Sequence, residues 1–312
     1  MKTFLKFLKY LFTLSLLLVI AIAIYAYAPD QPIDKLKNDW TYPESKFVSV
    51  NDTDVHYRRS GSGFPLVLLH GTGASLHTWE GWTNALQNDY KIISLDLPAF
   101  GLTGPSKDRD YSIDAYVEFV NQFLSKIGVD SFALAGNSLG GGIAWNYAAK
   151  YPDNIKGLIL IDPTGFKQMK KLPMALSIAK NKMIAPMLKK FSPKFLFSKS
   201  LKEVYYNDEI LTQNIIDRYY QLFLREGNRQ AYIDRAQTPT TYNTDLLNDL
   251  SIPTLIMWGA NDEWITSKDA MKFKKRIKSA KVLIYSKMGH VPMEEAPAQT
   301  AKDANDFLKN NL

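Results

Sequence analysis

The 312-residue sequence predicts an α/β fold, in which a mostly parallel sheet of eight strands carries helices on both faces and a helical insertion. Three observations support this. Short apolar segments bounded by glycine, proline or aspartate alternate with helical patterns along most of the chain. The first two strand-like segments follow each other without a helix, which predicts an antiparallel edge. Residues 164–248 interrupt the alternation with helical patterns alone.

A long apolar segment begins the chain. Residues 10–28 carry no charge and follow three lysines, Lys2, Lys6 and Lys9, and this length is enough for a helix to span a bilayer. We expect residues 1–28 to be a transmembrane signal anchor, with the lysines on the cytoplasmic side and the remainder of the chain exported. Ala26 to Ala28 also resemble a signal-peptidase site, so secretion after cleavage is the alternative, although Pro29 directly after the cut disfavours it.

Residues 29–46 are polar and contain prolines, so we expect a linker with little structure of its own. The folded core then occupies residues 47–163 and 249–312. Strands are expected at residues 46–50, 54–60, 65–71, 91–98, 131–137, 157–163, 253–259 and 281–286, and helices at 112–128, 138–152 and 267–279. Ser112 is the expected N-cap of the first of these helices.

The insertion at residues 164–248 is predicted to be a lid over the carboxyl edge of the sheet, where open α/β sheets bind their ligands. Residues 166–202 contain ten lysines and no acidic residue. Subtracting these ten and the three anchor lysines from the net charge of +7 leaves the remainder of the chain at −6, so no nucleic-acid partner is expected. Lysines mixed with Met, Leu, Ile and Phe suit contact with an anionic membrane; a lid with a solvated lysine face is the alternative.

Several kinds of site are excluded or disfavoured. The chain has no cysteine, which excludes disulfides, thiolate metal sites and a cysteine nucleophile. It also contains neither H-E-x-x-H nor G-x-G-x-x-G. We therefore expect no metal and no nucleotide cofactor.

Ser138 is the candidate nucleophile. It is the central residue of Gly136-Asn137-Ser138-Leu139-Gly140, which matches G-x-S-x-G between a strand-like and a helix-like segment. The glycines permit a strained backbone and a closely packed helix. A serine in this position is presented at a sharp turn between a strand and a helix.

A serine hydroxyl needs a base, and the base needs an acid to orient it. His290 follows the last predicted strand and Asp262 follows the strand before it, so both side chains can reach the edge of the sheet where Ser138 lies. Glu263 is the nearest rival for the role of acid. Asp162 is a weaker rival, better interpreted as a turn residue at a strand end.

The glycine turn in "LLHGTGASLHTW" is the candidate oxyanion loop. We expect the backbone amides of Thr72 and Leu139 to form the oxyanion hole, with Gly73 as a substitute for Thr72. His70 is expected to order this loop. The two other histidines, His56 and His77, are expected to be structural or exposed.

Five segments in order, "HGTGASLHTWEGW", "DLPAFGLTGP", "GNSLGGG", "WGANDEWI" and "GHVPMEEAP", resemble the α/β-hydrolase superfamily, and especially the bacterial family V lipases and esterases. The resemblance covers the chain from about residue 47 to the end. It implies the α/β-hydrolase fold, carboxylic-ester hydrolysis, an inserted lid, and the triad positions for Ser138, Asp262 and His290. Haloalkane dehalogenases and epoxide hydrolases are also similar, but they carry aspartate where this chain has Ser138. Ala99 stands where relatives often have glycine.

The sequence thus predicts a serine esterase or lipase. Its expected substrates are small-molecule or lipid esters, such as acylglycerols. Carbon–carbon bond hydrolysis, perhydrolysis and acyl transfer would use the same triad and remain alternatives. A ligand-binding receptor without activity is a further alternative.

Overall fold

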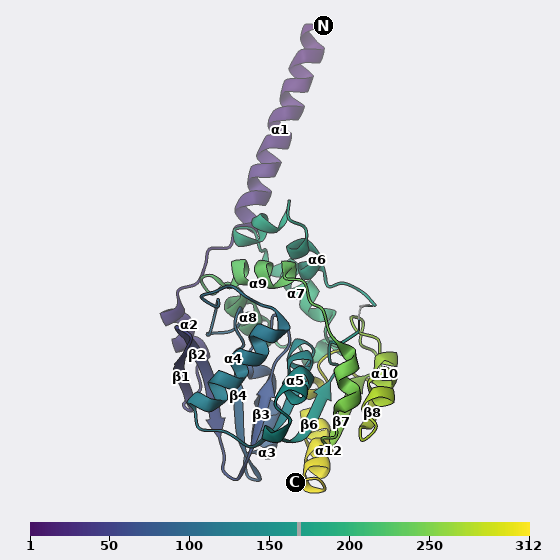
Figure 1. Ribbon diagram of the computed structural model, residues 1–312. Coiled ribbons are helices and arrows are strands. Elements are labelled where there is room, and N and C mark those ends of the chain that lie inside the picture. Colours follow the sequence, from purple (N-terminus) through teal and green to yellow (C-terminus); the bar gives the residue numbers. More distant parts are fainter. Residues whose placement is uncertain (167–169) are drawn as a thin grey trace.

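The computed structural model describes residues 1–166 and 170–312. Helix α1 (Lys2–Ala26) projects from a rounded body, and the C-terminal helix α12 (Pro297–Lys309) lies at the opposite end of that body (Figure 1). None of the residues of α1 is buried, and its length and composition would allow it to cross a membrane.

An eight-stranded sheet forms the centre of the body, in the order β1-β2-β4-β3-β5-β6-β7-β8. Strands β1 and β2 pair antiparallel, as do β2 and β4, and the other neighbours are parallel. This confirms the predicted fold class and its antiparallel edge. The strands are β1 Ser45–Val50, β2 Thr53–Ser60, β3 Phe64–Leu69, β4 Tyr90–Leu95, β5 Phe132–Asn137, β6 Ile155–Ile161, β7 Thr254–Gly259 and β8 Lys281–Tyr285.

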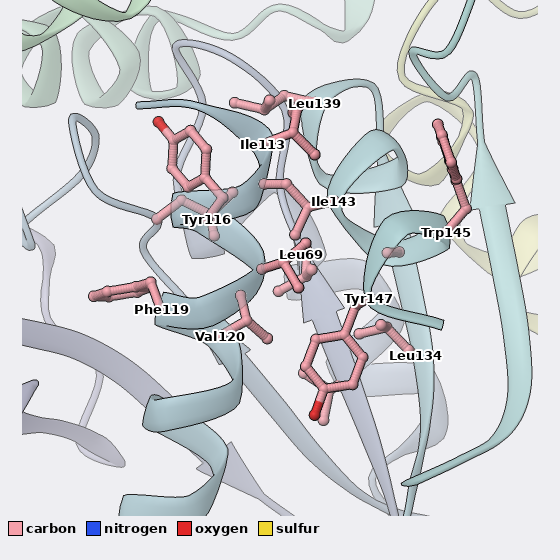
Figure 2. Close-up of a cluster of buried hydrophobic side chains, with 14 of the residues drawn as sticks. Leu69, Ile113, Tyr116, Phe119, Val120, Leu134, Leu139, Ile143, Trp145 and Tyr147 are labelled. Atoms are coloured by element: carbon pink, nitrogen blue, oxygen red, sulfur yellow. The ribbon is translucent and has the colours of Figure 1, made fainter. Parts of the chain in front are cut away.

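Helices cover both faces of the sheet because alternate residues of the strands point to opposite sides. In β3, Val67 and Leu69 pack with one core cluster, which includes residues of α4 (Ile113–Lys126), α5 (Leu139–Lys150) and α10 (Lys268–Arg276). Figure 2 shows Leu69 and Leu134 of the sheet beside side chains of α4 and α5. The neighbouring strand residues, Leu66 and Leu68, pack on the other face against α3 (Glu80–Leu86) and α12.

Two turn positions bear on the sequence analysis. The hydroxyl of Ser112 accepts a hydrogen bond from the backbone N–H of Ala115 at 3.2 Å, so Ser112 is the N-cap of α4 as expected. Ala99 has a φ of 80°, in the region that favours glycine. Ala99, which stands where the resemblance implies glycine, is therefore strained.

The inserted segment is helical. Residues 167–169 of the predicted lid lie outside the described residues, and the described remainder of 164–248 contains no strand. It consists of α6 Met174–Lys180, the 3-10 helix η3 Ala185–Lys189, α7 Lys194–Lys202, η4 Asp208–Ile210, α8 Gln213–Phe223, α9 Asn228–Gln237 and η5 Thr244–Asp249. In Figure 1, α6, α7 and α9 lie between α1 and the sheet.

The prediction that residues 29–46 have little structure of their own is wrong. They contain helix α2 (Ile33–Trp40), and its Leu36 is fully buried in a small cluster with Leu102 and Leu222. Trp40, which is partly buried, packs against the same cluster and donates from Nε1 to Oε1 of Gln221 at 3.0 Å. These two side chains dock a helix whose other residues are mostly polar.

Candidate active site

Ser138 occupies a strained turn between β5 and α5. Its φ of 54° and ψ of −115° are rare for a residue with a side chain. The turn is held by its N–H, which donates to the carbonyl of Ile161 at 3.0 Å, and by its carbonyl, which accepts from the N–H of Thr164 at 3.0 Å. The backbone thus fixes the direction in which the hydroxyl points.

Two glycines make this turn possible. A Cβ at Gly136 would lie 2.2 Å from the carbonyl oxygen of Gly140, and a Cβ at Gly140 would lie 2.2 Å from the carbonyl oxygen of Leu69. These oxygens belong to the backbone and cannot move aside. The start of α5 can therefore pack this closely against the sheet only if positions 136 and 140 have no side chain. The expected close packing of the glycines is therefore present.

His290 and Asp262 are directly paired. The Nδ1 atom of His290 lies 2.6 Å from Oδ2 of Asp262, and both side chains are almost completely buried. The other carboxylate oxygen, Oδ1, accepts the N–H groups of Trp264 at 2.7 Å and Ile265 at 3.0 Å. An ionised carboxylate only accepts hydrogen bonds, so the Nδ1 atom carries the hydrogen and the Nε2 atom has a free lone pair.

Nε2 of His290 has no hydrogen-bond partner within the described part of the chain. Ser138 and His290 line the same pocket, although no hydrogen bond joins their side chains among the described residues. Nucleophile and base are often further apart in a ligand-free site than during the reaction. The structure brings together the three side chains that the sequence analysis selected.

The backbone of His290 is held from two directions. Its carbonyl accepts the side-chain amide of Asn137 at 3.0 Å, and its N–H donates to the carbonyl of Val204, in the lid, at 2.8 Å. Glu295 strengthens the second connection by accepting from the N–H of Gly289 at 2.5 Å and from that of Tyr206 at 2.8 Å. Burial raises the pKa of Glu295. The sequence analysis did not identify these hydrogen bonds around Gly289 and His290, because most of the groups that form them are backbone groups.

The two rival acids differ. The Oε2 atom of Glu263 lies 3.2 Å from the Nζ atom of Lys171 near the surface, and Glu263 has no described contact with His290. Asp162 is fully buried; its Oδ1 atom accepts the N–H of Gly259 at 3.1 Å, and its Oδ2 atom has no partner among residues 1–166 and 170–312. Burial, followed by the charge of Asp262, raises the pKa of Asp162 well above its usual range.

Asp162, Asp262 and His290 each offer one potential ligand atom, and these atoms all lie within 4.8 Å of one another. They are the one such group that the described residues contain. Because Nδ1 of His290 and Oδ2 of Asp262 already bond to each other, we assign no metal to this group. A protonated Asp162 beside a charged Asp262 explains the close approach of the two carboxyl groups.

The candidate oxyanion donors border the same pocket. Thr72 and Gly73 line it after β3, and Leu139 is the first residue of α5, where backbone N–H groups have no partner within the helix. His70 orders the loop, since its Nδ1 atom bonds to the carbonyl of Gly71 at 2.8 Å and its Nε2 atom accepts from the N–H of Leu97 at 2.9 Å.

The remaining histidines, His56 and His77, are both buried. The Nδ1 atom of His56 lies 2.8 Å from Oδ2 of Asp96, and His77 bonds through Nε2 to the carbonyl of Trp40 at 2.8 Å. Burial lowers the pKa of His77 to about 3, so it is neutral at physiological pH. His56, in β2, thus joins its strand to Asp96, and His77 joins its turn to the end of α2; neither lines the pocket.

The pocket is mostly apolar. It opens to the surface, and its lining includes both Ser138 and His290. The inserted segment 164–248 contributes Pro173, Ala175, Phe197, Leu201 and Phe223 to its lining, while Trp264 and Val291 come from the core. A pocket in which Ser138 lies among mostly apolar side chains suits a substrate with an apolar part.

Comparison with known proteins agrees with this geometry. Residues 65–297 match the family model for the alpha/beta hydrolase fold. Lipase 3 of Moraxella sp. (strain TA144) is 30% identical over 258 residues, which cover 79% of this chain and 78% of the lipase.

Two further relatives differ in their reported activity. The crystal structure of a bacterial membrane phospholipase A has a TM-score of 0.74 at 28% identity, and the match covers 97% of this chain and 98% of that protein. The 2-hydroxymuconate semialdehyde hydrolase of Pseudomonas sp. (strain CF600) is 24% identical over 82% of this chain and 90% of its own length. From its fold, its family-model match and its lipase relatives, the chain belongs to the α/β-hydrolase family.

Proposed function

We propose that this protein is a serine hydrolase that cleaves carboxylic esters with Ser138 as nucleophile, His290 as base and Asp262 as acid. The observation that carries the proposal is the His290–Asp262 hydrogen bond of 2.6 Å, which leaves Nε2 unpartnered in a pocket that also contains Ser138. A buried, unpaired ring nitrogen is costly, and proton transfer from a nucleophile gives it a function.

The reaction takes two steps. In the first, His290 Nε2 takes the proton of Ser138 as its hydroxyl oxygen attacks the ester carbonyl, and the amides of Thr72 and Leu139 stabilise the oxyanion. His290 then protonates the leaving alcohol, which departs from the acyl-enzyme. In the second, His290 activates a water molecule that releases the acid and regenerates Ser138. Asp262 stabilises the imidazolium in both steps.

We expect a lipid-like ester, such as an acylglycerol, as substrate. The pocket has a mostly apolar lining, and the chain is 30% identical to Lipase 3 and 28% identical to a membrane phospholipase A. Helix α1 serves as the membrane anchor in this proposal, with the catalytic domain on the exported side, and secretion after cleavage is the alternative.

A series of p-nitrophenyl esters from C2 to C16 tests the proposal. Ser138→Ala is expected to lower kcat/KM by at least about 10³-fold on every ester that the wild type cleaves. Ser200→Ala is the matched control, because Ser200 also lines the pocket and has no part in the mechanism. If ester turnover survives in Ser138→Ala, or no ester is cleaved at all, the proposal is wrong.

Carbon–carbon bond hydrolysis is the second candidate, because a 2-hydroxymuconate semialdehyde hydrolase is among the relatives. The ester series and a 2-hydroxy-6-oxo-dienoate assayed side by side distinguish the two. We expect turnover of esters alone. Turnover of the dienoate that depends on Ser138, without ester cleavage, would reassign the reaction and keep the triad. Perhydrolysis and acyl transfer are detected by adding hydrogen peroxide or an alcohol to the ester assay.

A further inference from the structure

The end of α1 is built into the lid. The N–H of Ala28 donates to the carbonyl of Lys190 at 2.8 Å, and the N–H of Ser192 donates to the carbonyl of Ala26 at 3.1 Å. Between these bonds, Tyr27 and Phe191 form an antiparallel bridge. Residues 26–28 therefore pair with the lid like a short strand, which fixes the direction in which α1 leaves the body.

The residues that follow tie the same segment to a second part of the lid. Nη2 of Arg229, in α9, lies 2.7 Å from Oδ1 of Asp30, and the arginine side chain is only 2% exposed. The N–H of Gln31 donates to the carbonyl of Leu224 at 2.8 Å. The helix that would cross a membrane and the lid thus behave as one connected unit.

A group of exposed apolar side chains lies beside this connection. We call residues 182–195 the lid tip; its exposed apolar side chains are Met183 (90% exposed), Ile184 (40%), Met187 (57%) and Phe195 (53%). Four lysines, at positions 182, 189, 190 and 194, accompany them, and residues 166–202 contain no acidic residue. Apolar side chains within a basic rim are typical of a surface that enters the headgroup region of an anionic bilayer.

The lid tip adjoins the pocket. It connects α6, which supplies Ala175 to the pocket lining, with α7, which supplies Phe197 and Leu201. In Figure 1, α1 leaves the body on the side of α6, α7 and α9, away from the C-terminus. A bilayer crossed by α1 would therefore meet the lid before any other part of the body.

We propose that the lid tip docks on the membrane crossed by α1, in the boundary between headgroups and acyl chains of an anionic bilayer, and admits membrane-resident acyl esters directly into the pocket. This inference rests on the proposed ester hydrolysis and adds the source of the substrate. The anchor orients the lid through the bonds of residues 26–31, so that docking needs no separate encounter with the surface.

The location of the lid tip can be measured without activity. Because the chain has no cysteine, Met187→Cys can be labelled at one position with an environment-sensitive fluorophore in the full-length protein. Reconstituted into vesicles of phosphatidylcholine and phosphatidylglycerol, this label is expected to shift to the blue and to be quenched by spin-labelled lipid. Met271→Cys, 60% exposed on α10, is the control and is expected to remain in water. Equal quenching of the two labels, or none at position 187, overturns the proposal.

Activity provides the second test. The Met183→Ser, Met187→Ser double variant is compared with the wild type on p-nitrophenyl butyrate in solution and on a fluorogenic phospholipid ester within the same vesicles. We expect the vesicle rate to fall at least tenfold and the soluble rate to change less than twofold. A Met271→Ser, Ile284→Ser variant is the matched control for loss of exposed apolar side chains. Equal losses on both substrates overturn the proposal.

The role of the anchor is tested by separating it from the lid. A Gly/Ser insertion of about twelve residues between Tyr25 and Ala26 adds a flexible reach of roughly 20 Å and leaves residues 26–31 in place. We expect the vesicle rate to fall while the soluble rate persists; an unchanged vesicle rate would contradict orientation by the anchor. If position 187 is quenched but no ester is cleaved, the proposed function fails and the docking surface stands.

Discussion

Asp162→Asn tests which of two buried carboxyl groups is the acid. Asp162 and Asp262 have oxygens within 4.8 Å of each other, and two full charges at that distance repel by about 3 kcal/mol at an effective dielectric constant of about 20. One proton on Asp162 removes this repulsion, in agreement with its raised pKa. Asparagine imitates the protonated acid, still accepts the N–H of Gly259, and tolerates the φ of 43° at this position.

We therefore expect Asp162→Asn to retain kcat/KM on p-nitrophenyl butyrate within about threefold, a change below 1 kcal/mol. Asp262→Asn should lose about 10⁴-fold, because an amide no longer selects the tautomer with hydrogen on Nδ1 of His290. The kcat/KM values of both variants are measured from pH 6 to 9 in one detergent. A loss in Asp162→Asn as large as that in Asp262→Asn would refute the assignment and make Asp162 the charged partner.

The same substitution changes how stability depends on pH. The folded protein holds a proton on Asp162 that the unfolded chain releases above a pKa of about 3.9, so wild-type stability falls as the pH rises from about 4 toward the raised folded-state pKa. Asparagine has no proton to lose. The Tm of Asp162→Asn should therefore exceed that of the wild type by an amount that grows with pH, on the order of a few degrees. A Tm difference independent of pH would contradict this.

Four further substitutions follow from the packing. Three are measured by thermal and chemical unfolding of the full-length chain in detergent, and the other, Gly140→Ala, is measured by ester cleavage. Leu36→Ala should cost about 2–5 kcal/mol, because this side chain is fully buried; a cost near zero would mean that α2 is not docked. Gly140→Ala should abolish ester cleavage, since its Cβ would lie 2.2 Å from a backbone oxygen, and wild-type rates would contradict the geometry of the turn. Asp30→Asn should cost about 1–2 kcal/mol, less than a fully buried pair because Asp30 is 41% exposed; a wild-type Tm would contradict this. Ala99→Gly should gain up to about 1 kcal/mol by relieving the φ of 80°, and a destabilised variant would contradict it.

The sheet was predictable because short local segments of the sequence encode its strands. Each of the eight predicted segments overlaps a strand of the structure, since a buried strand requires apolar residues over a short, bounded stretch. Helices α3 and α12 were not predicted, although α12 has an apolar face of Ala301, Ala304, Phe307 and Leu308. Helix α2 was misjudged because its docking depends chiefly on Leu36 and Trp40, which are too few to form a periodic apolar pattern.

The grouping of the candidate site residues was predictable for a related reason. Ser138, Asp262 and His290 each follow a strand of one parallel sheet, and the carboxyl ends of such strands meet at one edge. Asp162, interpreted from the sequence as a turn residue at a strand end, also lies beside this group. Its burial and its closeness to Asp262 depend on the packing of β6 against β7, which local sequence does not encode. The hydrogen bond between His290 and Val204 joins two backbone groups. Every residue type has these groups, so the sequence gives no sign of the bond.

The contact between α1 and the lid shows why some functional relations cannot be predicted from local sequence. Its central bonds join the backbone of Ala26 and Ala28 to that of Ser192 and Lys190, and its ion pair joins residues 199 positions apart. No periodicity or composition encodes such a pairing. Both segments nevertheless have the composition that a membrane interface requires: the anchor is apolar, and the lid tip is apolar and basic. In the proposed docking, α1 determines which surface faces the bilayer, and that surface includes the lid tip, which connects two helices that line the pocket.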